Sequence, residues 1–131
     1  MKLLSKLIIL AILGLNACAK NDKEISLIKE INQEAEMIQA YKEGVNALEE
    51  NDTFFAAKKF LEAELLFPQS DWAPKSSLMA SYAYYIEGNY SEAIYNLERF
   101  LKTYPKDLRL DYAYYLMGLS YYENIEGEKK D

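Results

Sequence analysis

The chain has 131 residues, with 21 acidic against 15 basic side chains and a net charge of −6 at neutral pH. This acidic balance argues against a nucleic-acid partner, because phosphates require a basic patch. The chain has no histidine and one cysteine, which excludes an internal disulfide and removes the common nucleophile–base pairs and most zinc sites. We therefore expect no catalytic centre, no metal site and no bound cofactor.

Residues 1–17 read as a bacterial export signal. Two lysines precede an apolar run at residues 7–15, which is too short to span a bilayer as a stable anchor. The following Leu-Asn-Ala-Cys at residues 15–18 resembles the lipobox of bacterial lipoproteins, in which the cysteine is linked to a diacylglycerol and becomes the first mature residue. We expect a covalent lipid on Cys18. The alternative is an ordinary secreted protein with a free thiol.

The residue after Cys18 bears on localisation. Ala19 stands where lipoproteins retained at the inner membrane commonly carry aspartate, so the resemblance implies a lipid anchor on the periplasmic face of the outer membrane. Residues 18–24 are expected to form the lipidated tether, and residues 25–131 the folded domain.

From Ile25 onward the apolar residues recur with a helical period and show no strand-like alternation. After a first helix that begins there, further helices are predicted at about residues 53–67, 74–87, 90–104 and 108–125, separated by turn signals. Asp52, Asn89 and Asp107 are predicted N-caps, and Pro74 suits the first turn of its helix. The predicted class is all-α.

An internal repeat of 37 residues relates Gly44 to Ser81 and Ser81 to Gly118, and likewise Pro68 to Pro105. Small residues at fixed places in paired helices, followed by a closing proline, resemble the tetratricopeptide repeat, whose usual period is 34. The resemblance implies a helical-hairpin solenoid with repeats at about residues 36–70 and 73–107, and an incomplete one at 108–131. The alternative is an irregular helical bundle.

Packing gives this spacing its physical meaning. The missing side chain at Gly44 lets an antiparallel helix approach closely, and Ala56 and Phe60 are the expected facing residues. The helix after Asp107 is apolar almost all round, so we expect it to be buried on every side. The second helix of its hairpin is missing from this sequence. We expect the chain to be a fragment of a longer protein; the alternative is that another molecule covers this face.

Eleven of the 12 tyrosines lie between residues 82 and 122. In tetratricopeptide arrays the first helices of successive hairpins line a concave face, which predicts a groove that binds an extended or helical peptide. The predicted groove residues are Tyr41, Val45, Leu48, Leu78, Tyr82, Tyr85, Tyr112, Tyr115, Leu119 and Tyr122. The alternative is that these rings fill an ordinary core between stacked helices.

Two phrases make the resemblance more specific. Ser-Tyr-Ala-Tyr-Tyr at residues 81–85 precedes Gly-Asn-Tyr-Ser-Glu-Ala at residues 88–93, and Asp-Tyr-Ala-Tyr-Tyr-Leu-Met-Gly-Leu occupies residues 111–119. Over residues 36–122 the chain resembles the BamD family of outer-membrane assembly lipoproteins, whose members are longer.

The resemblance implies a non-enzymatic scaffold in the β-barrel assembly machinery. Its partners would be BamA, other subunits of the machinery, and unfolded outer-membrane proteins, whose C-terminal signal ends in an aromatic residue. The alternative is another tetratricopeptide lipoprotein that serves pilus assembly or the coordination of envelope and cell-wall growth. An envelope enzyme with an unrecognised pair of acids is the weakest hypothesis.

Overall fold

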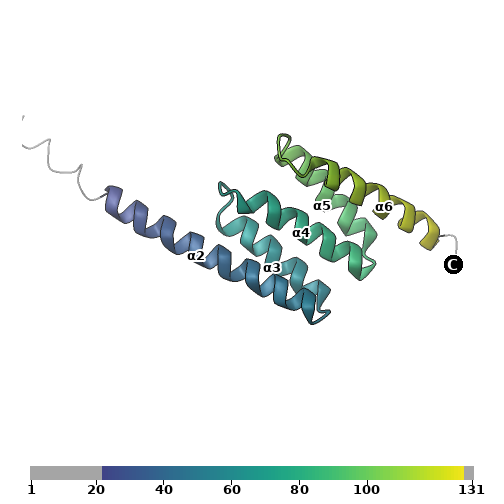
Figure 1. The fold of residues 1–131 in the computed structure, drawn as a ribbon, viewed down its shortest axis with the longest axis horizontal. Coiled ribbons are helices and arrows are strands. Elements are labelled where there is room, and N and C mark those ends of the chain that lie inside the picture. The colour runs from purple at the N-terminus through teal and green to yellow at the C-terminus, as the bar shows by residue number, and fades with distance from the viewer. Residues whose placement is uncertain (1–21, 129–131) are drawn as a thin grey trace, which may run out of the picture. The chain divides into compact units, whose positions relative to one another are not determined.

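The computed structural model describes residues 22–128, and nearly all of this part is helical (Figure 1). The helices, in chain order, are α2 (Asp22–Glu49), α3 (Thr53–Leu66), α4 (Trp72–Glu87), α5 (Tyr90–Thr103) and α6 (Leu110–Glu128). The predicted all-α class is confirmed, since no strand occurs between residues 22 and 128. The predicted signal peptide at residues 1–17 and the lipidation site Cys18 lie outside the described residues.

The chain divides into two compact units, residues 1–32 and residues 33–131. Of the first unit the structure describes residues 22–32, which form the opening turns of α2 and begin three residues before the predicted start at Ile25. All contacts described below belong to the second unit.

Local sequence signals explain where the helices begin and end. The Asp52 side chain accepts a hydrogen bond from the amide of Phe55 at 3.1 Å, and Asn89 accepts one from the amide of Glu92 at 3.4 Å. Each such N-cap contributes about 1 kcal/mol by satisfying an amide that has no partner inside the helix. Gly88 ends α4 with a φ of +79°, a conformation that costs glycine little. The predicted caps at Asp52 and Asn89 are confirmed.

The first hairpin pairs the end of α2 with α3, and its closest approach is at Gly44. A β-carbon placed on Gly44 would lie 2.8 Å from Cε1 of Phe60, whose ring is fully buried. Small residues surround this contact, which lets the helix backbones come close and bury the ring. The core cluster contains Ala47, Ala56, Ala57, Phe60, Ala80 and Ala83. The packing that the repeat predicted for Gly44 and Phe60 is confirmed.

The second hairpin pairs α4 with α5, and α6 packs against both of these helices. A second core cluster joins these three elements; it contains Leu78, Leu97, Phe100, Ala113 and Leu116. Ala80 and Ala83 of α4 belong to the first cluster, whereas Leu78 belongs to the second, so α4 is shared between the two hairpins. The result is a tetratricopeptide-like stack of helical hairpins, as the repeat indicated.

The connection before α6 differs from the prediction. Asp107 does not cap a helix at residue 108; α6 begins at Leu110, and the Asp107 carboxylate instead binds the backbone and the guanidinium of Arg109. The reason is that a following arginine offers the carboxylate three donors in fixed geometry, which competes with the helical amides.

One side of α6 carries no packed helix in the described part of the chain. Gly118, which occupies the same repeat position as Gly44, would place a β-carbon with no neighbour within 4 Å. Tyr114 and Tyr121 of α6 are 57% and 44% exposed.

Candidate functional site

A pocket of about 280 Å³ lies between α4 and the start of α6. Its lining is formed by Lys75, Leu78, Met79, Tyr82, Arg109 and Tyr112. The α4 residues follow a helical spacing that places them on one side of the helix, and Tyr112 comes from the first turn of α6. We call this the α4–α6 pocket.

Two cationic side chains, Lys75 and Arg109, line the α4–α6 pocket together with its apolar residues. The Lys75 ammonium lies 4.5 Å from the ring centroid of Trp72 and 5.0 Å from that of Tyr41, so two aromatic faces hold it in place. In the described part of the chain Lys75 forms no ion pair. Arg109, by contrast, donates to both carboxylate oxygens of Asp107 at 2.7 Å. Lys75 is therefore the cation available to a ligand.

The structure gathers three of the predicted groove residues into this pocket. Leu78 is 5% exposed, Tyr82 is half-buried and Tyr112 is 43% exposed, and all three line the pocket. Burial raises the pKa of the Tyr112 hydroxyl, and so do the neighbouring tyrosines 82, 115 and 85. Tyr112 therefore remains a neutral hydrogen-bond donor well above physiological pH.

The other predicted residues do not line the pocket. Tyr115 and Tyr122 are 62% and 61% exposed on α6, and the Tyr115 ring lies 6.4 Å from that of Tyr112. Tyr85 is half-buried beside Tyr90, with ring centroids 5.7 Å apart. The half-buried residues that remain are Tyr41, Val45, Leu48 and Leu119.

Tyr41 belongs to the packing of the first hairpin. Its ring meets Phe60 edge-on at 5.2 Å and Trp72 at 5.0 Å. Sequence reasoning missed Trp72 and Lys75, although they stand three residues apart at the start of α4 and so lie on one face of it. Tyr41 therefore does not line the α4–α6 pocket, although its ring contacts Lys75, which does.

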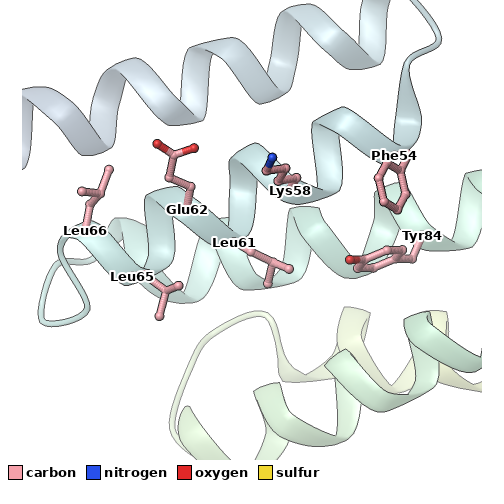
Figure 2. Close-up of a pocket in the computed structure, with 7 residues that line it drawn as sticks. All are labelled: Phe54, Lys58, Leu61, Glu62, Leu65, Leu66 and Tyr84. Atoms are coloured by element: carbon pink, nitrogen blue, oxygen red, sulfur yellow. The ribbon is translucent and has the colours of Figure 1, made fainter.

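A second pocket, of about 570 Å³, lies along α3 and was not predicted (Figure 2). Phe54 and Tyr84 stand at one end of it and Leu65 and Leu66 toward the other, as Figure 2 shows. The full lining is Phe54, Lys58, Leu61, Glu62, Leu65, Leu66 and Tyr84. The spacing of Phe54, Leu61 and Leu65 is the signal that could have indicated this apolar stripe, because it places the three on one face of α3.

The described residues contain neither a candidate metal site nor a candidate membrane span. Between residues 22 and 128 no group of three or more acidic, histidine or cysteine side chains is placed to hold a metal ion. None of the helices in the same span is long and apolar enough to cross a membrane.

The model of a protein family described as an outer membrane lipoprotein, YfiO, matches residues 33–131. This chain belongs to that family. The matched residues coincide with the second unit, so the family match covers the helical hairpins and the α4–α6 pocket together.

Individual relatives agree with the family match. The outer membrane protein assembly factor BamD of Caulobacter vibrioides is 33% identical over 114 residues, which make up 87% of this chain and 36% of that protein. BamD of Rickettsia prowazekii is 28% identical over 130 residues, 99% of this chain and 49% of the relative. BamD of Neisseria gonorrhoeae is 34% identical over 110 residues, 82% of this chain and 40% of the relative.

These comparisons confirm the resemblance to the BamD family that the sequence motifs indicated. The chain spans less than half of the length of each of these relatives.

Proposed function

We propose that this chain is part of the machinery that assembles β-barrel proteins in the outer membrane, and that it acts there as a scaffold without catalysis. The observation that carries the proposal is the family match over the whole second unit, residues 33–131. The names of its relatives, outer membrane protein assembly factor, point to the same process. The proposed partners are BamA, the other subunits of the machinery and unfolded outer-membrane proteins.

The proposed attachment to the membrane is a lipid on Cys18, on the periplasmic face of the outer membrane. Its support is the signal-like sequence before Cys18 together with the lipoprotein description of the family. One acyl chain binds a membrane only marginally, whereas two or three hold a protein durably. The lipid is the only non-protein group that the proposal requires.

The proposed substrate site is the α4–α6 pocket. The pocket offers apolar contact to an aromatic side chain through Leu78, Met79 and the rings of Tyr82 and Tyr112. The two tyrosines also bring hydroxyl groups to the site. Lys75 stands where a negative charge next to that side chain would gain a favourable interaction. This chemistry suits the end of an unfolded chain that terminates in an aromatic residue and a free carboxylate.

A titration tests the site directly. A fluorescent peptide that ends in phenylalanine with a free carboxylate is titrated against the parent chain and against a Tyr82→Ala/Tyr112→Ala variant. We expect the variant to bind about 30-fold more weakly or worse, because removing aromatic contacts at the centre of a binding site costs about 2 kcal/mol or more. Fluorescence anisotropy gives both affinities, and circular dichroism checks that the variant is folded.

Tyr95→Ala is the matched control, since Tyr95 is 64% exposed on α5 and does not line the α4–α6 pocket. It should bind like the parent. The same peptide with an amidated end should bind more weakly to the parent, and this difference should shrink in Lys75→Gln. Equal affinity of the parent and the double tyrosine variant for the peptide contradicts the proposed site.

A pull-down from solubilised membranes tests the wider assignment. Co-purification of BamA with the membrane-bound protein supports a role in barrel assembly. Co-purification of a secretin or of cell-wall enzymes in place of BamA supports the alternative scaffold role instead.

A further inference from the structure

A polar cluster around the buried carboxylate of Glu64 joins the two hairpins. Glu64 lies in the last turns of α3, is 4% exposed, and accepts hydrogen bonds from Arg99 Nη1 at 2.7 Å and Nη2 at 2.6 Å. The Tyr104 hydroxyl donates to the same carboxylate at 2.7 Å, and Arg99 also donates to the Ser77 hydroxyl at 3.0 Å. The Glu64 carboxylate therefore connects α3 to the end of α5, and Arg99 extends the connection to Ser77 of α4.

The geometry of this cluster restricts orientation as well as distance. A bidentate arginine–carboxylate pair holds two planar groups in one relative arrangement, unlike a lysine, which acts as a point charge. The Glu64 hydrogen bond raises the pKa of Arg99, and burial together with Glu64 raises the pKa of Tyr104. Arg99 thus stays charged and Tyr104 stays a neutral donor over the whole physiological range.

Stability alone does not account for such a cluster. Withdrawing the Glu64 carboxylate from water costs several kcal/mol, and the guanidinium of Arg99, whose side chain is 34% exposed, loses part of its hydration as well. The attraction between the two groups only roughly offsets that cost. Apolar replacements of both partners are often neutral or stabilising, whereas removal of one partner leaves a buried charge unpaired. An apolar pair could not reproduce the fixed relative orientation of the carboxylate and the guanidinium.

The position of the cluster links it to the α4–α6 pocket. Arg99 precedes Phe100 in α5. Phe100 packs with Leu78, which lines the α4–α6 pocket, and with Leu116 of α6. The orientation of α5 therefore decides where α6 lies against α4, and Glu64 holds α5 from the first hairpin.

We propose that Glu64 and Arg99 are positioning residues that fix the angle between the two hairpins, and with it the separation of α2 from α6. This role goes beyond the proposed function, because it sets a distance inside the protein and needs no bound peptide. It is therefore tested without one.

Distances between spin labels measure the effect. Cys18, the single cysteine, is replaced by serine, and labels are attached to cysteines introduced at the exposed positions Lys42 on α2 and Asp111 on α6. The parent should give one narrow peak in the distribution of label-to-label distances measured by pulsed electron–electron double resonance. A Glu64→Leu/Arg99→Leu variant should lose that single narrow peak while its thermal unfolding midpoint stays equal or rises.

Two further variants serve as a control and as a second test of the pair. Glu43→Leu/Lys59→Leu removes an ion pair of 2.8 Å that joins α2 to α3 inside the first hairpin, and it should leave the peak unchanged. Arg99→Lys keeps the charge and loses the planar fork, so it should broaden the peak even if the double leucine variant fails to fold. An unchanged narrow peak in a folded Glu64→Leu/Arg99→Leu variant, or in Arg99→Lys, overturns the proposal.

Discussion

Two glycines show how one repeat position acquires opposite physical roles. Gly44 and Gly118 are separated by two repeat periods, yet a β-carbon would crowd the Phe60 ring at Gly44 and meet nothing within 4 Å at Gly118. The difference arises because α3 packs against the first site and no helix covers the second in the described part of the chain. Small size is therefore required at Gly44 and unused at Gly118.

Alanine substitutions should separate the two sites. Gly44→Ala should lower the free energy of unfolding by about 1–3 kcal/mol, because overpacking moves a fully buried ring. Gly118→Ala should raise it by up to about 1 kcal/mol, because alanine is the better helix former and its methyl group meets no neighbour. Urea unfolding of both variants measures the difference. Two shifts of the same sign would contradict this account of the helix contacts.

At the scale of the elements, the connection between α5 and α6 depends on an ion pair. The Asp107 carboxylate holds the Arg109 guanidinium at 2.7 Å and also accepts from its amide at 2.8 Å. These bonds, with the Arg109 side chain as the largest cause, lower the pKa of Asp107 below its ordinary value of 3.8. The folded protein therefore favours the ionised form more strongly than the unfolded chain does.

The stability of the connection should consequently depend on pH. The contribution of Asp107 is fully present above about pH 4, where the unfolded chain is ionised, and it is lost as the pH falls through the lower folded pKa. Asp107→Asn should therefore be less stable than the parent at pH 7, and the gap should close toward pH 3. Urea unfolding from pH 7 to pH 3 measures the gap. Glu87→Gln, which removes an exposed carboxylate at the end of α4, is the control and should show no such gap.

At the scale of the whole second unit, stability is distributed along a stack of neighbours. α4 packs against α3 on one side and against α5 and α6 on the other, whereas the contacts of α6 in the described residues are with α5 and α4. In repeat proteins each element is stabilised chiefly by its neighbours, so an element covered on more sides opens less often.

Hydrogen exchange should therefore follow position in the stack. In this chain the amides of α4 should exchange most slowly, and those in the last turns of α6 should exchange fastest among the paired helices. Exchange followed by mass spectrometry on the intact chain gives protection for each helix from one sample. Equal protection of α4 and α6 would mean that the unit opens only as a whole.

Most of the helical architecture follows from the sequence alone. Helical periodicity, two N-caps and Gly88 placed α3, α4 and α5 within about two residues of their observed bounds, because these signals act within one turn of the chain. The repeat also identified the contact of Gly44 with Phe60, since equal spacing in successive hairpins implies equal packing. Asp107 was the exception, because its neighbour Arg109 offered it better donors.

The tertiary structure decided how the site is assembled. Leu78, Tyr82 and Tyr112 meet in one pocket, and Lys75 lies over the Tyr41 ring, because of the way α4 packs against α6 and the end of α2. The pair of Glu64 and Arg99, 35 residues apart, depends likewise on how α3 and α5 are placed. Periodicity reports which side of a helix is apolar, but two packed helices can rotate against each other without changing that pattern. Only the folded chain therefore shows which side chains of different hairpins face one another.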